Sequence, residues 1–330
     1  MSVIVPVLNE ADHLESAVAA ILQQQWQPGL EVVLAVGPST DGTESVAAAI
    51  AAVDPRVIVV DNPSGRTPDA LNAAIAVSRH DPVIRVDAHT ELPAGYIATA
   101  VRTLAETGAD NVGGIMQPSG QTSFERAVAI AMTSPVGVGS AVYHTGGQAG
   151  ESESVYLGAF RRRALTRVGG YDPRFTRAQD WEMNHRIRES GGKVWFTPEL
   201  VVTYRPRPNL RALGRQYFQY GQWRRLVMQV HEQTRRRSSA LRYLAPPLLV
   251  LTLAAALLAS LIGWLLPTLA FADVVADAIA LPVAYIGAVV AASIVIGRRL
   301  RPAALVWLPA VIIVMHITWG CGFIRGERLS

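Results

Sequence analysis

Apolar residues are distributed unevenly along this 330-residue chain, and this limits its fold more than any other feature. Between Leu244 and Gly297 the only side chains ionised at neutral pH are Asp273 and Asp277. A helix needs about 20 consecutive apolar residues to cross the hydrocarbon core of a bilayer. Three segments reach that length, at residues 244–266, 274–296 and 303–324. The sequence therefore predicts a water-soluble part followed by about three C-terminal transmembrane helices.

The charges beside these segments predict their orientation. The loop Arg298-Arg299-Leu300-Arg301 is basic, whereas the expected loop Phe271–Asp277 carries only acids. Because basic loops remain in the cytosol, we expect residues 1–242 and 298–302 on the cytosolic side of the plasma membrane. Three crossings would leave the C-terminal tail outside. The first segment could instead be re-entrant, since prolines lie in or beside it (Pro246, Pro247 and Pro267), and a buried hairpin within the protein is a further alternative.

The rest of the composition excludes several functions for residues 1–242. The single cysteine, Cys321, rules out an intrachain disulfide and a cysteine-based zinc site. Lys193 is the only lysine, and no lysine-and-aromatic pattern for tracking a phosphate backbone occurs, so we expect no nucleic-acid partner. The apolar run Ser2–Val7 has no basic leader and favours a first strand over a signal peptide. We therefore expect the soluble part to stay in the cytosol.

Strand-like and helix-like segments alternate over the first 115 residues. The expected strands are Val3–Val7, Glu31–Val36, Val57–Val60 and Pro82–Val86, and the expected helices are Glu10–Gln25, Thr43–Ala52 and Thr67–Ser78. This alternation predicts an α/β fold with a doubly wound, mostly parallel sheet. Ligands bind such sheets beyond the carboxyl ends of the strands. Asp41 and Asp87 both fall at such ends.

A different pattern follows from Phe124 to Pro206, where glycine-rich loops connect shorter elements. Here we expect helices at Ala164–Val168 and Trp181–Ser190, and strands at Lys193–Phe196 and Val201–Tyr204.

The stretch from Leu210 to Arg242 is basic and amphipathic. Its arginines alternate with aromatic residues (Arg211, Arg215, Arg224, Arg225 and Arg235-Arg236-Arg237, with Tyr217, Phe218, Tyr220 and Trp223). Such a helix suits an anionic membrane surface, and a solvated helix face is the alternative. We accordingly expect a soluble domain at 1–206, an interfacial segment at 207–242 and a membrane domain at 243–330.

Asp87 and His89 form a candidate metal site after the fourth expected strand, in Val86-Asp87-Ala88-His89. A carboxylate and an imidazole suit manganese, whereas magnesium prefers oxygen ligands alone. Asp is also common as a helix cap at strand ends, so this pair alone is weak. Asp41 opens a helix in the same way, and capping could explain it equally well. Glu10, just after the first strand, has the same ambiguity.

Asp180 follows the glycine-rich turn Gly169-Gly170-Tyr171-Asp172 and begins an expected helix. A helix N-terminus favours an ionised carboxylate, as a base that activates a hydroxyl requires. Asp180 and Glu182 could also be ordinary caps. Trp181 and Trp195 offer flat faces that could stack on a sugar, although a single tryptophan is more often part of a core.

Together these motifs resemble the family 2 inverting glycosyltransferases with a GT-A fold, in the branch of the succinoglycan-type exopolysaccharide glucosyltransferases. The resemblance spans nearly all of the soluble part. It is carried by Val5-Pro6-Val7-Leu8-Asn9-Glu10, Ser39-Thr40-Asp41-Gly42-Thr43, Leu71-Asn72, Val86-Asp87-Ala88-His89, Leu157-Gly158-Ala159-Phe160-Arg161-Arg162, Gly169-Gly170-Tyr171-Asp172 and Gln179-Asp180-Trp181-Glu182-Met183-Asn184.

The resemblance implies a role for each matching position. Asp87 and His89 would bind a divalent ion, Mn2+ or Mg2+, and the donor diphosphate. Asp180 would be the catalytic base that deprotonates an acceptor hydroxyl. The remaining positions would line the nucleotide, with Asp41 at the uridine end and three residues beside the base and ribose (Pro6, Leu8 and Glu10).

Three departures from the family pattern affect details. Val36-Gly37-Pro38 stands where the family has an acid that recognises uracil, and His89 replaces the second Asp of the metal motif. Gln219-Tyr220-Gly221-Gln222-Trp223 resembles the Gln-X-X-Arg-Trp of processive synthases, but has Gln222 in place of the arginine. We therefore expect single addition and not polymerisation.

The expected protein is a membrane-anchored enzyme that moves a hexose from a nucleotide-diphosphate sugar, with UDP the expected nucleotide. Its acceptor would be a hydroxyl of a lipid-linked saccharide, in cell-surface polysaccharide or glycolipid synthesis, and its other partners membrane lipids. One alternative is a polyprenyl-phosphate sugar synthase, whose phosphate acceptor needs no hydroxyl base. Another is a non-catalytic membrane scaffold with a degenerate transferase domain.

Overall fold

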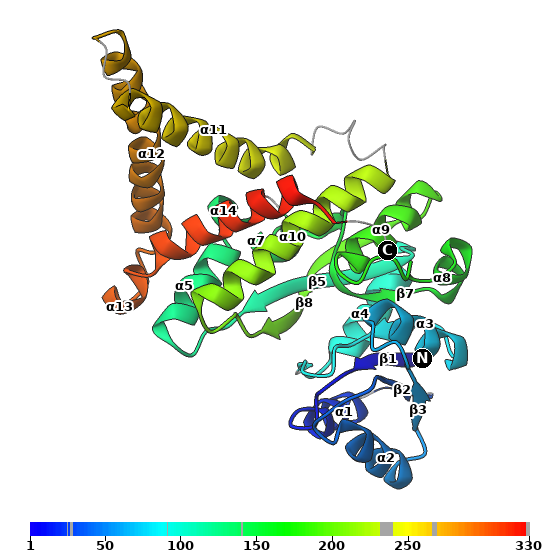
Figure 1. Ribbon diagram of the computed structural model, residues 1–330. Coiled ribbons are helices and arrows are strands. Elements are labelled where there is room, and N and C mark those ends of the chain that lie inside the picture. Colours follow the sequence, from blue (N-terminus) through cyan, green and yellow to red (C-terminus); the bar gives the residue numbers. More distant parts are fainter. Residues whose placement is uncertain are drawn as a thin grey trace. The chain divides into compact units, whose positions relative to one another are not determined.

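The computed structural model describes residues 1–24, 26, 29–90, 92–139, 141–231, 240–265 and 269–327 (Figure 1). The chain forms two compact units that alternate along the sequence. The first contains Met1–Gln117 and Ala141–Tyr204, and the second contains Pro118–Ser140 and Arg205–Ser330. The division at residues 206 and 242 expected from the sequence stays a prediction.

Within the described residues, one eight-stranded sheet of order β3-β2-β1-β4-β7-β5-β8-β6 organises the first unit. Its parallel strands are β1 (Ser2–Val7), β2 (Glu31–Val36), β3 (Val57–Asp61) and β4 (Val83–Arg85). Its other strands are β5 (Asn111–Pro118), β6 (Gly150–Glu151), β7 (Tyr156–Phe160) and β8 (Val194–Tyr204). Strand β7 runs antiparallel to both β4 and β5. The mostly parallel α/β sheet predicted from the sequence is confirmed.

Two hydrophobic clusters contain the apolar side chains of the sheet. Val3 and Val5 of β1 belong to the first cluster, whereas Ile4 between them belongs to the second. Successive side chains of a strand point to opposite faces, so β1 is buried on both. The helices of this unit are α1 (Leu14–Leu22), α2 (Thr43–Val53), α3 (Thr67–Val77), α4 (Tyr96–Thr107), α7 (Val142–Thr145), α8 (Arg162–Val168) and α9 (Gln179–Glu189).

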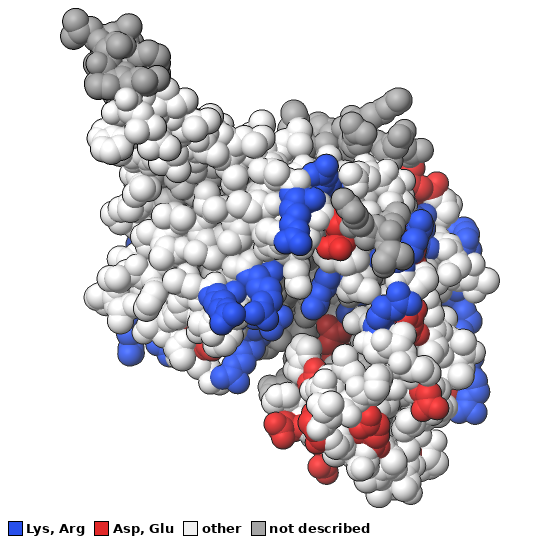
Figure 2. All heavy atoms as spheres, viewed as in Figure 1, with Lys and Arg blue, Asp and Glu red and all other residues white. Residues whose placement is uncertain are grey.

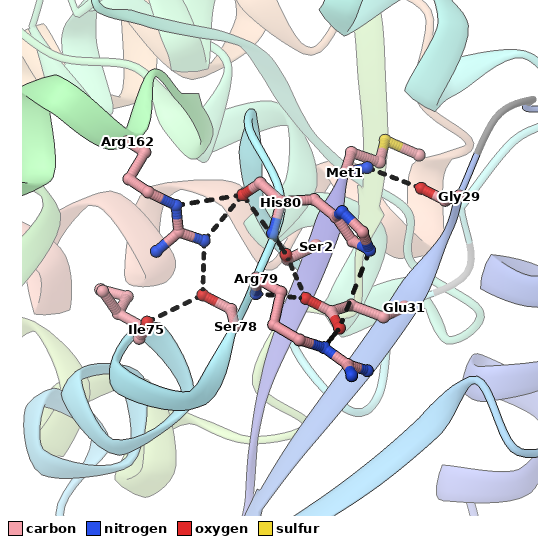
Figure 3. Close-up of polar contacts among 9 residues, drawn as sticks. All are labelled: Met1, Ser2, Gly29, Glu31, Ile75, Ser78, Arg79, His80 and Arg162. Atoms are coloured by element: carbon pink, nitrogen blue, oxygen red, sulfur yellow. Dashed lines mark hydrogen bonds and ion pairs between the residues drawn. The ribbon is translucent and has the colours of Figure 1, made fainter.

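A polar network fastens the amino ends of β1 and β2 (Figure 3). The Glu31 side chain is only 3% exposed. Its Oε1 accepts hydrogen bonds from Ser2 Oγ and from the Arg79 backbone N–H, each at 2.6 Å, and its Oε2 accepts one from Arg79 Nε at 2.9 Å. Because this network lies at the amino ends of the strands, it stabilises the sheet at the edge opposite the candidate site.

The helix expected at Glu10–Gln25 is shorter, at Leu14–Leu22, and other bounds shift by one or two residues. A break between two strands that was expected near residue 198 is wrong. The two strands expected at 193–196 and 201–204 are a single strand, β8. Pro198 and Glu199 interrupt the apolar pattern there, and both side chains are exposed. The fixed φ of proline is compatible with an extended backbone where its missing N–H is not needed. The strand therefore continues through a position that ends the hydrophobic pattern.

Helices make up most of the second unit as described. They are α5 (Ser123–Met132), α6 (Pro135–Val138), α10 (Leu210–Val230), α11 (Ala240–Leu265), α12 (Leu269–Ile296), α13 (Pro302–Leu305) and α14 (Leu308–Arg325). In the described part of the chain, three helical segments are long and apolar enough to cross a membrane: Tyr243–Leu265, Ala278–Ile296 and Pro302–Arg325. The expectation of C-terminal apolar helices is confirmed.

The loop expected at Phe271–Asp277 is wrong, because these residues belong to α12. The two acids interrupt the apolar pattern of the sequence, but they do not interrupt the helix. The run Arg235-Arg236-Arg237 lies outside the described residues.

Candidate active site

The loops after β1 and β2 are fastened to one another at the carboxyl ends of these parallel strands. Asn9 Oδ1 accepts a hydrogen bond from the Thr40 N–H at 2.8 Å, and the Asn9 N–H donates to Ser39 Oγ at 3.1 Å. Asp41 Oδ2 accepts from the Ala11 N–H at 3.1 Å. The two loops thus form one rigid rim, as expected of a ligand-binding edge.

Asp41 also fixes the start of α2. Its Oδ1 accepts hydrogen bonds from Thr43 Oγ1 at 2.5 Å and from the Thr43 N–H at 3.1 Å. The Thr43 side chain, more than any other group, lowers the pKa of Asp41, and the Ala11 and Thr43 N–H groups add to this effect. Asp41 therefore stabilises the start of α2, which is the structural role that the sequence left open.

Leu8 and Gly37 face one another on this rim. Leu8 is 41% exposed, while Pro6 in β1 is partly buried. A Cβ atom on Gly37 would lie 3.0 Å from Leu8 Cδ1 and 3.2 Å from the Gly65 Cα. This close approach explains why a glycine stands where an acid was expected, because an acidic side chain at residue 37 would displace its neighbours.

Arg85 joins the two acids that the sequence singled out separately. Its side chain, at the end of β4, is 5% exposed. Nε and Nη2 donate to Asp87 Oδ1 at 3.0 and 2.9 Å, and Nη1 donates to Asp180 Oδ1. A buried guanidinium requires compensation by opposite charge, and here two carboxylates supply it. Asp87 and Asp180 are therefore brought together, although 93 positions separate them in the sequence.

Asp180 lies in the first turn of α9 with its side chain 26% exposed. The preceding Ala178 has φ 57°, a left-handed conformation that is unusual for a residue with a Cβ. Strained backbone of this kind is concentrated at functional sites. Burial raises the pKa of Asp180, the Arg85 guanidinium opposes this, and the negative charge of Asp87 adds to it. The raised pKa makes Asp180 a stronger base than an exposed aspartate.

Asn72 of α3 holds the glycine-rich turn that precedes α9. Its Oδ1 accepts from the Tyr171 N–H at 2.8 Å, and its Nδ2 donates to the Tyr171 carbonyl at 2.7 Å. Gly170 has φ 74°, and a Cβ there would lie 2.6 Å from Asn72 Oδ1. The Leu-Asn and Gly-Gly-Tyr-Asp motifs therefore form a single structural unit.

Two tyrosines contribute to the surroundings of the acids. Burial, more than the negative charge of Asp180, raises the pKa of Tyr171. Burial likewise raises the pKa of Tyr156, with Asp87 adding to the effect. Tyr156 lies where the pairing of β5 with β7 shifts register, and such irregularities often occur next to active sites. Both phenols therefore stay neutral near the carboxylates.

Glu10 and His89 form a second pair on the rim. The Glu10 Oε1 lies 2.9 Å from His89 Nδ1, and the His89 side chain is 54% exposed. A carboxylate accepts the Nδ1 proton, which leaves Nε2 with a lone pair for a metal ion. The structure therefore gives Glu10 a contact with the candidate metal ligand, a contact that the sequence did not predict.

The donor atoms near Asp87 fit a metal ion that also binds substrate. Within the described ranges, no group of three or more His, Cys, Asp or Glu side chains is arranged to hold a metal alone. Asp87 and His89 nevertheless supply one carboxylate and one imidazole. Divalent ions in phosphate-transfer sites commonly take one or two protein ligands and complete their shell with phosphate oxygens and water. The two residues fit that kind of site.

Glu182 and Trp181 have structural surroundings. Glu182 is fully buried and pairs with Arg186, through Arg186 Nε and Nη2 at 2.6 and 2.7 Å. Trp181 is buried and stacks on His185 with 5.3 Å between the ring centroids. Trp195 is partly buried and packs against the first hydrophobic cluster. Of the three acids in α9 (Asp180, Glu182 and Glu189), Asp180 pairs with Arg85 and Glu182 pairs with Arg186.

Sequence reasoning missed Arg85, Tyr156 and Tyr171 as parts of the site, and gave Asn72 no role. Arg85 left a usable signal, because it is the only charged residue in the apolar strand Val83–Val86. A charge that is forced into a buried strand must find a partner. The tyrosines left no such signal, since buried tyrosines are common in any core.

Known proteins resemble this chain in sequence and structure. The family model described as Glycosyl transferase family 2 matches residues 2–169. The succinoglycan biosynthesis protein ExoA of Rhizobium meliloti is 32% identical over 98% of this chain and 93% of its own length. The glycosyltransferase AglE of Haloferax volcanii is 29% identical over 38% of this chain and 43% of its own length.

A solved structure extends the similarity to the fold. The mannosyltransferase PcManGT from Pyrobaculum calidifontis, in complex with GDP-Man and Mn2+, superposes with a TM-score of 0.59. It is 25% identical in sequence, and the match covers 95% of this chain and 85% of that one.

Proposed function

Because the chain belongs to glycosyl transferase family 2 and is a glycosyltransferase of GT-A fold, we propose that it moves a hexose from a nucleotide-diphosphate sugar to a hydroxyl of a lipid-linked saccharide. The transfer inverts the anomeric configuration. The observation that supports this most directly is the pairing of Asp87 and Asp180 on one buried guanidinium, that of Arg85. It places a base candidate beside a diphosphate-binding candidate.

Asp180 takes the proton from the acceptor hydroxyl in this proposal. Its raised pKa suits a general base, whose strength grows with its proton affinity as long as it remains ionised at the working pH. Attack from the face opposite the leaving diphosphate then inverts the anomeric carbon. Arg85 orients the Asp180 carboxylate, and Tyr156 and Tyr171 stay neutral near it.

Asp87 and His89 hold the diphosphate end of the donor. A divalent ion bound there, manganese or magnesium, would offset the charge that develops on the leaving diphosphate. The similar mannosyltransferase is described in complex with Mn2+, which supports a divalent ion for this chain as well.

The rim formed by the loops after β1 and β2 holds the nucleotide. Pro6, Leu8 and Glu10 lie beside the base and ribose, and Asp41 supports the uridine end. We propose a UDP-sugar as donor. Gly37 stands where an acid that recognises uracil was expected, and the similar mannosyltransferase is described with GDP-Man. GDP-sugars are therefore the donors with which UDP-sugars must be compared.

Membrane attachment brings the active site to its acceptor. The described apolar helices could cross a membrane by length and composition, and we place the enzyme in the plasma membrane with residues 1–206 in the cytosol. A lipid-linked saccharide meets such a site at the cytosolic leaflet. The expected products are intermediates of cell-surface polysaccharide or glycolipid synthesis.

A donor screen on the full chain in nanodiscs tests the proposal. Thermal shift with UDP- and GDP-sugars, with and without Mn2+, should show the largest stabilisation for one UDP-sugar with Mn2+. Transfer of that sugar to extracted lipid-linked saccharides should follow. Asp180→Asn should lower the rate by about 10²- to 10⁴-fold, the usual contribution of a general base, whereas Asp54→Asn at the end of α2 should not.

Two results would overturn parts of the proposal. If the product is a polyprenyl-phosphate sugar, the acceptor is a phosphate and Asp180 is not a hydroxyl base. If no donor binds and Asp180→Asn changes nothing, the chain is a membrane scaffold with a degenerate transferase domain.

A further inference from the structure

Helices α11 and α12 have the surface of membrane spans. In Tyr243–Leu265 and Ala278–Ile296 the mean hydropathy is 2.4, and only 6% and 11% of the residues are buried. Large apolar side chains such as Leu257, Trp264 and Val283 are more than half exposed. At about 1.5 Å per residue, 23 helical residues extend about 35 Å, enough for a hydrocarbon core of about 30 Å. The two helices pack against one another.

Helix α14 has a different surface. The apolar segment that contains α13 and α14, Pro302–Arg325, is 33% buried and has a lower mean hydropathy of 1.9. Its buried positions contact protein and not solvent or lipid (Leu308, Val311, Ile312, Met315, Gly320 and Gly322). Figure 1 shows α14 beside α10 in the second unit, and Figure 2 shows mostly uncharged atoms over the described parts of α11, α12 and α14. Low charge alone therefore does not distinguish α14 from a span, but its packing does.

Glycines bring α14 into direct backbone contact with α10. A Cβ on Gly221 of α10 would lie 2.0 Å from the Trp319 carbonyl oxygen, and one on Gly322 of α14 would lie 1.9 Å from the Phe218 carbonyl oxygen. Further back, Gly214 of α10 faces Val314 and Thr318. The residue numbers of the contacting positions rise together along α10 and α14. The two helices therefore run side by side in the same direction.

Polar groups of α10 hold the end of α14. Gln222 Nε2 donates to the Gly326 carbonyl at 3.0 Å, and Arg225 Nη1 donates to the Phe323 carbonyl at 3.2 Å and to the Ile324 carbonyl. The last carbonyls of a helix have no partners within it. Arg225 and Gln222 of α10 donate hydrogen bonds to carbonyls at the end of α14. The end of α14 would therefore lie at the same depth in a membrane as Arg225.

Helix α10 is unsuited to crossing a bilayer. It carries four arginines and no acid (Arg211, Arg215, Arg224 and Arg225). An arginine at the centre of a bilayer is strongly disfavoured. The arginines lie toward both ends of a 21-residue helix, so a crossing orientation would place charges on both sides. A helix of this composition instead lies at an anionic lipid surface.

The beginning of α14 packs against another charged helix. Trp307 meets Phe124 of α5 edge-on, with 5.6 Å between the ring centroids, and His316 Nε2 lies 2.7 Å from the Val136 carbonyl of α6. Helix α5 carries Glu125 and Arg126. Both ends of α14 therefore contact elements that carry charge, while its middle contacts α12, where His316 Nδ1 lies 3.1 Å from the Tyr285 hydroxyl.

We propose that α14 does not cross the membrane but lies with α10 at its cytosolic surface. Helices α11 and α12 then make the two crossings of the membrane. The C-terminus is then on the same side of the membrane as the N-terminus. The lipid surface facing α10 is anionic, matched to the exposed Arg211 and Arg215. Exposed Val306 and Trp307 enter the interface, where tryptophan is favoured. This inference replaces the three crossings expected from the sequence, and it rests on the proposed membrane attachment but not on the transfer chemistry.

Cysteine accessibility in intact spheroplasts tests the proposal. Starting from the Cys321→Ser chain, single cysteines are introduced by Glu327→Cys after α14, Arg299→Cys after α12 and Thr268→Cys between α11 and α12. An impermeant maleimide should label only the Thr268→Cys protein in intact cells and all three after permeabilisation. Labelling of the Glu327→Cys protein in intact cells as fast as the Thr268→Cys protein would overturn the proposal.

A second measurement avoids dependence on any one substitution. The unmodified full chain is fused at its C-terminus to green fluorescent protein or to alkaline phosphatase. A cytosolic C-terminus gives fluorescence without phosphatase activity, and a third crossing gives the reverse. Because neither readout needs sugar transfer, failure of the proposed function and failure of this topology are distinguishable.

Discussion

Arg85 and Asp180 form a buried ion pair between the end of β4 and the first turn of α9. The same guanidinium binds Asp87, so one side chain sets the distance and the charge balance between the proposed base and the proposed diphosphate ligand. Arg85 therefore holds both carboxylates in position.

The first prediction concerns the pH dependence of transfer. Asp180 acts as a base only when ionised, and burial raises its pKa above the ordinary aspartate value. Activity should therefore decline as the pH falls through this raised pKa, at a higher pH than an exposed aspartate would give. The measurement is kcat/KM from neutral to acidic pH, with folding followed at each pH by tryptophan fluorescence. An acid limb at or below the ordinary aspartate range would contradict the assignment.

Arg85→Gln should move this acid limb to higher pH. The substitution removes the charge that stabilises both carboxylates and leaves Asp87 to repel the ionised form of Asp180. We expect kcat to fall by at least about tenfold, since carboxylates no longer held in place lose their orientation. Arg85→Lys retains the charge and should recover the position of the limb better than it recovers kcat. A fall in activity without any change in the pH profile would indicate a purely structural role for Arg85.

The metal site yields a prediction for Glu10. If Glu10 holds the Nδ1 proton of His89, then Glu10→Ala should weaken Mn2+ binding in the presence of UDP by about 10- to 100-fold. Electron paramagnetic resonance of free Mn2+ measures this without turnover. The exposed Glu15→Ala serves as the matched control. Unchanged Mn2+ affinity together with weaker binding of metal-free UDP would instead place Glu10 at the base and ribose alone.

Sequence patterns predicted the elements of the first unit because each of them repeats over several residues. Val3–Val7 and Glu31–Val36 are continuous apolar runs, and a parallel strand buried on both faces has that composition. Asp87 and Asp180 could be chosen because motifs mark them. The contact between Arg85 and Asp180 was missed because 95 positions separate the two residues and no local pattern records it.

The second unit shows a different limit. Hydropathy does not distinguish a helix that faces lipid from one that faces protein, so 303–324 had the same pattern as the two segments before it. The difference lies in the glycines, of which Gly221 and Gly322 allow backbone contact and Gly287 has open space around it. Only the structure separates glycines with these different surroundings.

This contrast provides a stability test of the α10–α14 contact. A side chain on Gly322 would collide with the Phe218 carbonyl, and overpacking of this kind costs about 1–3 kcal/mol or more. Gly322→Val should therefore lower the melting temperature of the detergent-solubilised protein by several degrees. Gly287→Val in α12 adds the same side chain where no atom lies within 4 Å and should leave the melting temperature nearly unchanged. Equal shifts in both variants would contradict the close packing of α14.

The last prediction concerns acid stability and the network of Figure 3. Burial alone would raise the pKa of Glu31, but hydrogen bonds from the Arg79 N–H, Ser2 and the Arg79 side chain outweigh it and lower the pKa from 4.5 to about 2. A lowered pKa means that the folded state favours the ionised carboxylate. The stabilisation is therefore complete above pH 4.5 and is lost as the pH falls through about 2.

The size of this effect follows from the shift of the Glu31 pKa. At about 1.4 kcal/mol per pKa unit, it corresponds to roughly 3 to 4 kcal/mol of unfolding free energy at neutral pH. Glu31→Gln should lose much of this at pH 7 and show a weaker decline in stability between pH 5 and about pH 2. Denaturant unfolding at several pH values measures both effects, with the exposed Glu15→Gln as control. If Glu31→Gln matches the wild-type decline with pH, other carboxylates cause the acid sensitivity of the first unit and the Glu31 network does not.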